Sequence, residues 1–282
     1  LRLCDRVAIL RDGQLVAVRP AAELTDGEIV RLMVGRELSE FIQRRRAGTD
    51  REVLRVTGLR SNWHQDVSFH INAGEVVGFS GLIGAGRTEL AKVIFGELPK
   101  NGGSIVLDGQ ETTIRRPDDA IAKGIGFAPE DRKREGLVLI RSVLENASLA
   151  ILRRLSRFHF VRRGLERSIA SEYIETLRVR TPSLEQEVGK LSGGNQQKLL
   201  VGRWLMARSE FLIFDEPTRG IDVGAKKEVY HLLTDLAAAG KGILMISSEL
   251  PELFGICDRI LVMRRGRLVG DLNTRETTPE KV

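Results

Sequence analysis

The 282-residue sequence is poor in cysteine, in aromatic side chains and in long apolar runs. Its two cysteines, Cys4 and Cys257, are too few for a disulfide framework, and their spacing matches no metal site, so we expect a reducing compartment. No run approaches the roughly 18 apolar residues that a membrane-spanning helix needs. The first residues lack the basic, apolar and small-residue regions of a signal peptide, so we expect a soluble chain.

Acidic residues are outnumbered by basic ones, but only slightly. Lys and Arg total 44 against 38 Asp and Glu, which gives a net charge of +6 and a pI near 9.6. This excess is compatible with nucleic acid, a membrane surface or a phosphate ligand. The most basic segment, residues 153–167, has only Phe158 and Phe160 as aromatics, and we interpret it as a solvated helix face rather than a nucleic-acid site.

One short segment occurs twice. Residues 4–16 match residues 257–269 at seven of thirteen positions without a gap, each pair 253 positions apart. The repeat predicts an internal duplication whose first copy is present only as its tail, in agreement with the missing initiator methionine. We therefore expect residues 1–38 to end a first copy, 39–51 to form a linker and 52–282 to form a second copy. Chance convergence of two strand-turn-strand segments is the alternative.

Hydrophobic patterning from residue 52 onward predicts an α/β domain with a helical insertion. Strand and helix patterns alternate, while the segment from about 142 to 191 is mostly helical. Near the C-terminal end, two apolar runs enclose a helical segment, as in a buried parallel sheet. The expected strands lie within 53–59, 65–81, 210–217 and 240–249, and the expected helices within 87–98 and 225–240.

The stretch GLIGAGRTEL, which begins at Gly81, has the frame of a phosphate-binding loop between a strand and a helix. Gly81, Gly84 and Gly86 allow backbone N–H groups and the helix N-terminus to face phosphate oxygens, and Thr88 offers a hydroxyl to Mg2+. Arg87 stands where the pattern has lysine. It keeps the positive charge but presents a planar fork of different reach, so we expect nucleotide binding to survive better than catalysis. A structural glycine turn is the alternative.

Two adjacent carboxylates end the apolar run FLIFDEP, about 130 residues after the glycine loop. Ligands of parallel sheets bind at the carboxyl ends of the strands, which is where these acids are expected. Asp215 can hold Mg2+ through water, and Glu216 can orient or deprotonate an attacking water molecule. A solvated turn is the alternative, but the paired glycine loop argues against it.

The octet LSGGNQQK precedes a helical pattern. Ser192, Gly193 and Gly194 present a hydroxyl and bare backbone N–H groups at the helix N-terminus, where an anion is favoured. A simple helix cap accounts for Ser192 and one glycine, but not for the whole octet placed just before the two-carboxylate strand.

Together these motifs resemble those of the ATP-binding cassette (ABC) ATPases over residues 52–282. The resemblance implies an α/β fold with a RecA-like phosphate-loop core, a helical subdomain at about 131–191 and an N-terminal antiparallel β portion. It implies ATP and Mg2+ as ligands, and it adds Ala85 to the phosphate-binding loop. Two cassettes of this family pack head to tail, so Ser192 and its two glycines are expected to serve the ATP of the first copy.

Three positions depart from the family pattern around one site. Glu130 replaces the usual glutamine, Ser248 replaces the usual switch histidine, and Arg87 replaces the lysine. A carboxylate at 130 should repel phosphate unless Mg2+ or a base intervenes, so we expect a weakened site. Trp63 stands where the family often has an aromatic that stacks on adenine. No role is expected for His64, which we interpret as an ordinary surface or strand residue.

The motif set GLIGAGRTEL, PEDRKREGL, LSGGNQQK and DEPTRGIDVGAKKE is similar to the second half of the duplicated ATP-binding subunits of monosaccharide importers. This implies a peripheral protein on the cytoplasmic face of the membrane, bound to a permease and served by an extracytoplasmic sugar-binding protein, without nucleic acid. The sequence does not identify the sugar. A soluble tandem-cassette factor acting on ribosomes or nucleic acid, and a non-hydrolytic regulatory module, are the alternatives.

Overall fold

The computed structural model describes residues 4–11, 14–25, 28–29, 32, 48–158, 160–278 and 281–282. The expected linker 39–51 therefore lies mostly outside the described residues. Within the described part of the chain, no helix combines the length and the apolar character required to cross a bilayer.

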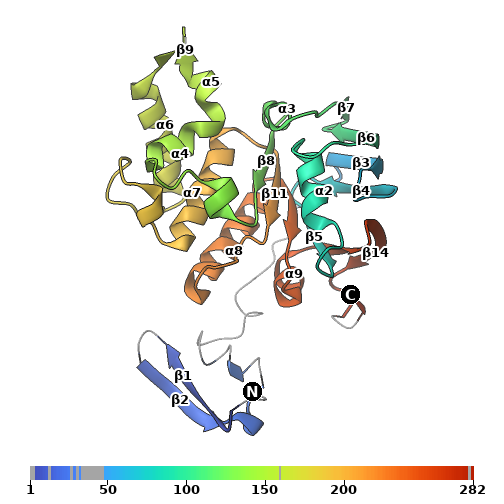
Figure 1. The fold of residues 1–282 in the computed structure, drawn as a ribbon, viewed down its shortest axis with the longest axis vertical. Helices are drawn as coiled ribbons and strands as arrows, with labels where there is room; N and C mark the ends of the chain where they lie inside the picture. Colours follow the sequence, from blue (N-terminus) through green and yellow to red (C-terminus); the bar gives the residue numbers. More distant parts are fainter. Residues whose placement is uncertain are drawn as a thin grey trace.

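A six-stranded sheet forms the centre of the molecule (Figure 1). Its strands are parallel except for the edge pair β13–β14, which is antiparallel. Every residue of β11 and of β12 is buried, because helices or a second sheet cover both faces. The order across the sheet is β14 (Arg267–Asn273), β13 (Arg259–Arg264), β5 (Val76–Gly81), β12 (Gly242–Ile246), β11 (Phe211–Asp215) and β8 (Ile125–Ala128).

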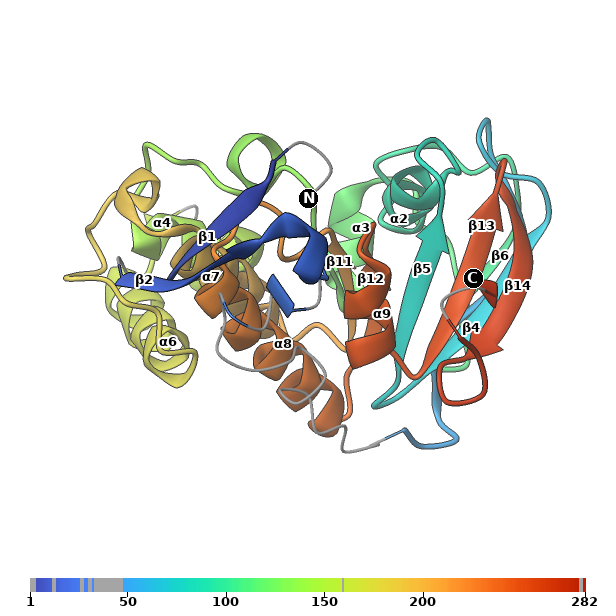
Figure 2. The same ribbon diagram turned by 90° about the horizontal axis from the view of Figure 1, so that it is seen from below.

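A four-stranded antiparallel sheet lies on the opposite side of the central sheet from the helical part (Figures 1 and 2). In β4 the buried residues are apolar and alternate with exposed or partly exposed ones. The strands, in spatial order, are β4 (Val67–Asn72), β3 (Glu52–Arg60), β6 (Gly102–Leu107) and β7 (Gln110–Thr112).

Helices flank the central sheet and form a separate helical part on one side (Figure 1). Those near the sheet are α2 (Arg87–Ile94), α3 (Pro117–Ala122), the π-helix η3 (Arg132–Gly136), α8 (Val223–Ala238) and α9 (Leu250–Ile256). The helical part contains α4 (Val143–Ser148), η4 (Leu149–Ile151), α5 (Leu152–Leu155), α6 (Arg163–Thr176), η5 (Val188–Lys190) and α7 (Gly193–Met206), with the small hairpin β9 (Ser156–Arg157) and β10 (Phe160–Val161). The α/β class with a helical part and an antiparallel sheet, expected from sequence, is confirmed.

The N-terminal hairpin repeats the C-terminal one. Strand β1 (Arg6–Arg11) pairs with β2 (Gln14–Pro20), and the short helix η1 (Ala21–Glu23) follows. Each pair in β1–β2, such as Arg6 with Pro20, has its counterpart in β13–β14 exactly 253 positions later, and both hairpins shift register at the corresponding step. The side-chain period of a strand is two, so a shift of the pairing by one residue would move every side chain to the opposite face of the hairpin. The identical register therefore means that corresponding residues face the same way in the two hairpins.

Candidate functional site

The phosphate-loop candidate connects the buried strand β5 to α2, as the sequence predicted. Gly81 has a φ of 152°, and a Cβ there would lie 2.4 Å from the Met263 carbonyl oxygen. Gly86 caps α2 with a φ of 102° in the left-handed region, which side chains disfavour. Between them Gly84 is exposed and Ala85 is buried, with its N–H bonded to the Leu82 carbonyl at 3.0 Å. The close contact at Gly81 and the left-handed φ at Gly86 therefore favour glycine at both ends of the loop.

His64 is buried and forms a hydrogen bond to the backbone of this loop. This corrects the expectation of an ordinary surface or strand residue. Only 2% of His64 is exposed, and its Nε2 lies 2.8 Å from the Gly86 carbonyl. Since a carbonyl only accepts, Nε2 carries the proton, and Nδ1 accepts from the Ser61 hydroxyl at 2.7 Å. Burial lowers the pKa of His64, and the bond to Gly86 opposes that shift. No pattern in the sequence indicated this contact.

Asp215 ends β11 and is 1% exposed. Burial raises its pKa to about 6. The Thr88 hydroxyl lies close enough to oppose the rise, yet neither carboxylate oxygen has a hydrogen-bond partner of regular geometry in the part of the chain that the structure describes. A buried, unpartnered carboxylate beside a hydroxyl is a donor set that suits Mg2+, so the residues present fit this ion.

Glu216 follows with a φ of 46°, in the left-handed region that is uncommon for residues other than glycine. Its N–H donates to the Ile246 carbonyl at 2.9 Å, and its carboxylate accepts from the Ser248 hydroxyl at 3.2 Å. Burial raises the pKa of Glu216, and the bonds to Ser248 oppose this. Ser248, at the position where the family usually has a histidine, therefore contacts Glu216, the candidate catalytic glutamate.

Arg87 is half-buried at the start of α2. Its Nη1 donates to the Ser247 carbonyl at 3.0 Å, at the end of the neighbouring strand β12. A guanidinium has five N–H donors, and this contact uses one of them. The side chain that replaces lysine is thus anchored to the strand-end loop.

Glu130 has a basic partner across the site. Its carboxylate forms an ion pair with the Arg219 guanidinium, from the loop that follows the two carboxylates. Arg132 in turn donates to the Arg219 carbonyl at 2.7 Å and to the Gly220 carbonyl at 3.1 Å, which holds this loop in place. Arg219 therefore offsets the negative charge of Glu130, which was expected to repel phosphate. From the sequence, a nearby basic group was one way in which this repulsion could be avoided.

These residues surround one pocket of about 690 Å³. The predicted residues that line it are Gly84, Ala85, Gly86, Arg87, Thr88, Glu130, Asp215, Glu216 and Ser248. Residues that were not predicted and line it include Thr218, Arg219, Lys226 and Glu249. The pocket joins an anion-binding loop, two carboxylates and three basic side chains, which suits a phosphorylated ligand with a bound cation.

Gly81 ends β5 just before the loop, and the other predicted residues that do not line the pocket are Trp63, Ser192, Gly193 and Gly194. Trp63 is 41% exposed and does not line the pocket. Ser192 is the exposed N-cap of α7, and its hydroxyl accepts from the Asn195 amide at 2.9 Å. Gly194 is buried at the same helix start, where a Cβ would lie 2.8 Å from the Ala225 Cβ. This chain therefore does not bring the Ser-Gly-Gly motif to its own pocket.

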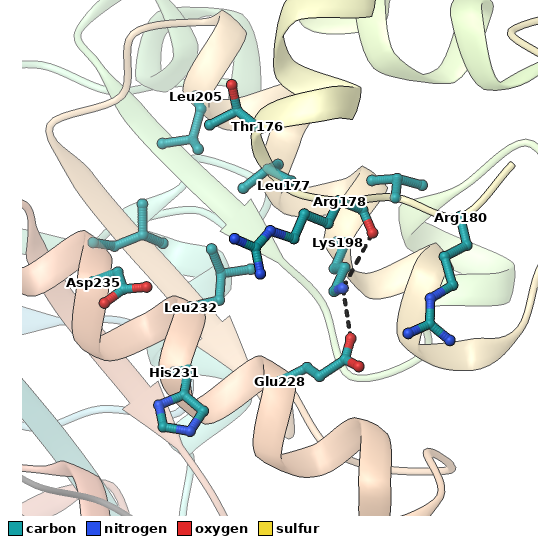
Figure 3. A pocket seen from close by; sticks show the side chains of 12 residues that line it. Thr176, Leu177, Arg178, Arg180, Lys198, Leu205, Glu228, His231, Leu232 and Asp235 are labelled. Atoms are coloured by element: carbon teal, nitrogen blue, oxygen red, sulfur yellow. Dashed lines mark hydrogen bonds and ion pairs between the residues drawn. The ribbon is translucent and has the colours of Figure 1, made fainter.

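A second cavity, of about 790 Å³, lies between the C-terminal end of α6, α7 and α8 (Figure 3). Lys198 spans it, with an ion pair to Glu228 at 2.5 Å and a bond to the Arg178 carbonyl at 3.3 Å. Lys198, the last residue of the LSGGNQQK octet, lines this cavity, but none of the glycine-loop residues and neither of the two adjacent carboxylates does, so its greater volume does not make it the candidate site.

Comparison with known proteins agrees with this geometry. Residues 64–219 match the family model described as ABC transporter. The chain is 50% identical over 282 residues to the ribose import ATP-binding protein RbsA 3 of Rubrobacter xylanophilus, covering 100% of this chain and 57% of that protein. It is 47% identical to a putative ribose/galactose/methyl galactoside import ATP-binding protein of Agrobacterium fabrum, covering 99% and 56%. The chain thus spans just over half the length of these relatives.

Solved structures with a similar fold are more distant in sequence. A nucleotide-free ATP-binding cassette from an ABC transporter superposes with a TM-score of 0.69 at 22% identity, over 79% of this chain and 91% of that one. A cassette in a dimeric post-hydrolysis state, bound to ADP and Pi, gives 0.66 at 20% identity, over 79% and 100%.

Proposed function

The chain belongs to the ABC transporter family, and we propose that it is one nucleotide-binding cassette of a bacterial monosaccharide importer. In this function it couples ATP binding and hydrolysis to uptake of the sugar. The relatives named as ribose and galactose import ATP-binding proteins, at 47 to 50% identity, support the substrate class.

The convergence of the glycine loop and the two carboxylates on one pocket supports ATP hydrolysis there. The loop N–H groups and the α2 N-terminus bind the phosphates, and Arg87 directs its remaining N–H groups toward them. Glu216 orients the attacking water and accepts its proton. Asp215 and Thr88 hold Mg2+, which when bound neutralises charge on the phosphate oxygens.

We further propose that this is the second cassette of a duplicated polypeptide. The equal registers of the β1–β2 and β13–β14 hairpins support the duplication, because they pair corresponding residues throughout. Ser192 lies on the surface and does not line the chain's own pocket, which agrees with head-to-tail packing. In the complete protein it completes the ATP site of the first cassette.

The proposed site binds ATP better than it hydrolyses it. Arg87 is anchored to the Ser247 carbonyl, and Ser248 bonds to Glu216 instead of offering an imidazole to the γ-phosphate. These contacts favour a retained nucleotide, while the corresponding site of the other cassette performs most of the turnover.

The helical part offers a surface for the permease. A groove of about 330 Å³ includes Val138 and Leu149 in its lining, and these side chains are 44% and 45% exposed, with Ile140 nearby at 82%. We propose that a helix of the permease binds here, which places the protein at the cytoplasmic face of the membrane. The sugar-binding protein acts on the other side, without contact to this chain.

The test is ATP turnover and labelled-sugar uptake by the full-length two-cassette protein, reconstituted in vesicles with its permease. We expect Glu216→Gln to retain more than half of the turnover. The same substitution at the corresponding acid of the first cassette is the matched control and is expected to abolish it. Loss of turnover with Glu216→Gln would mean that this site hydrolyses ATP, and absence of ATP-dependent monosaccharide uptake by the wild type would refute the transport function.

A further inference from the structure

A buried carboxylate lies behind the pocket, outside the motifs. Glu252, in the first turn of α9, is 1% exposed. Its Oε1 accepts from the Thr218 hydroxyl at 2.6 Å, the Tyr230 hydroxyl at 2.6 Å and the Lys226 ammonium at 3.1 Å. Its Oε2 accepts from the Ser247 hydroxyl at 2.8 Å. Four donors compensate the cost of burying this charge.

The donors come from three segments that meet at the pocket. Thr218 belongs to the loop after β11, Lys226 and Tyr230 to α8, and Ser247 to the segment just after β12. Burial and the Glu252 charge both raise the pKa of Tyr230, so its hydroxyl stays protonated and donates. Glu252 therefore joins the loop that follows the two carboxylates to the loop that follows β12.

Ser247 connects this buried carboxylate to Arg87. Its hydroxyl donates to Glu252 and accepts from the Glu249 N–H at 3.0 Å, while its carbonyl accepts from Arg87 at 3.0 Å. The Ser247 backbone is thus held on both sides. Without this anchor, the long and flexible arginine side chain would occupy many rotamers. Ordering it when the nucleotide binds would then cost conformational entropy and weaken binding.

We propose that Glu252 is a positioning residue for Arg87. Through Ser247 it holds the Arg87 guanidinium in the pocket, with the remaining N–H groups free to contact phosphate. The inference rests on the proposed function, because it takes the pocket as an ATP site. It assigns to Glu252 a part in nucleotide retention, although Glu252 does not line the pocket itself.

The test is a double-mutant cycle measured as binding of the fluorescent analogue mant-ATP to the full-length protein with Mg2+. We expect Glu252→Gln to raise the Kd about fivefold, roughly the value of one ordinary hydrogen bond. Ser247→Ala, a milder change that removes the same link, is expected to raise it similarly. In an Arg87→Ala background neither substitution should raise the Kd further, because there is no guanidinium left to position.

Glu166→Gln is the matched control. Glu166 is also 1% exposed and accepts from a serine hydroxyl, that of Ser148, at 2.7 Å, but it lies on α6 in the helical part. The Glu166→Gln substitution should lower the melting temperature about as much as Glu252→Gln while leaving the Kd for mant-ATP unchanged.

The outcomes separate this inference from the function on which it rests. If Glu252→Gln and Ser247→Ala weaken binding equally in the wild-type and Arg87→Ala backgrounds, or if Glu166→Gln weakens it as much, the role of Glu252 is only structural and the inference is wrong. The inference alone also fails if wild type binds, Arg87→Ala weakens binding and Ser247→Ala does not. Absence of binding by the wild type would refute the ATP site itself, and the inference with it.

Discussion

At the residue scale, Asp215 shows how a site can cost stability. Its folded-state pKa of about 6 lies above the ordinary value of 3.8, because the charged form is buried. The unfolded chain therefore loses this proton at lower pH than the folded chain. Folding is unaffected by this group below about pH 4, and stability falls as the pH rises through the window between the two pKa values.

We therefore expect Asp215→Asn to stabilise the metal-free protein at pH 7, by up to about 3 kcal/mol, and to change stability little at pH 4. The neutral amide avoids the buried charge. Urea unfolding at both pH values, with a chelator present, measures the difference. A variant no more stable than wild type at pH 7 would show that another group compensates the carboxylate.

At the same scale, the Arg87 side chain is fixed by a specific hydrogen bond rather than free to move. Its hydrogen bond to the Ser247 carbonyl joins the first residue of α2 to the loop after β12. Replacing lysine by arginine at this position is thus accompanied by a specific acceptor, which a lysine ammonium, as a point charge on a flexible stem, would use differently.

At the scale of elements, the pocket depends on loops that leave neighbouring strands. The loop after β8 carries Glu130 and the loop after β11 carries Arg219, and their ion pair joins the two. Both side chains are partly exposed, so the pair itself adds little to stability. Its larger effect is on the charge that a bound phosphate encounters.

We expect Arg219→Ala to raise the Kd for ATP about three- to tenfold, because Glu130 is then left uncompensated near the phosphates. Adding Glu130→Gln should restore most of the lost affinity, and Glu130→Gln alone should change it little. Isothermal titration calorimetry of the three variants checks this. If the double variant binds no better than Arg219→Ala alone, the arginine contacts the nucleotide directly and charge compensation is not its role.

At the scale of the whole molecule, the N-terminus of α7 lies outside the lining of the chain's own pocket. Ser192 is exposed there, and its side chain caps no backbone N–H of the helix. A partner surface can therefore reach the Ser192 hydroxyl without rearrangement of this helix.

Ser192→Arg in the full-length protein is expected to abolish more than nine-tenths of ATP turnover, because a long cation then occupies the phosphate position of the first cassette's site. Turnover is measured with the permease present. Ser183→Arg, at another exposed serine of the helical part, is the control and should leave turnover unchanged. Near wild-type turnover in Ser192→Arg would contradict the head-to-tail assignment.

Features that depend on neighbours along the chain could be predicted from the amino-acid sequence. The strand, glycine loop and helix at 76–94 are contiguous, and Asp215 and Glu216 end an apolar strand, so local pattern and periodicity sufficed to predict them. The α/β class followed from the same alternation of patterns. The repeated segment predicts a duplication, which stays a proposal, and the two hairpins share the same register.

The side chains that support these motifs could be identified only from the folded chain. His64 contacts Gly86 across 22 residues, and Arg87 reaches Ser247 across 160. His64 contacts the glycine loop from the connection between β3 and β4, which belong to the other sheet. The Arg87 contact arises because the sheet order β14-β13-β5-β12-β11-β8 does not follow the chain, so that β5 and β12 lie side by side. Packing of buried strands selects that order, and no local pattern encodes it. The glycine loop and the two carboxylates of the pocket were therefore predictable, whereas the residues that support them and pair with Glu130 were not.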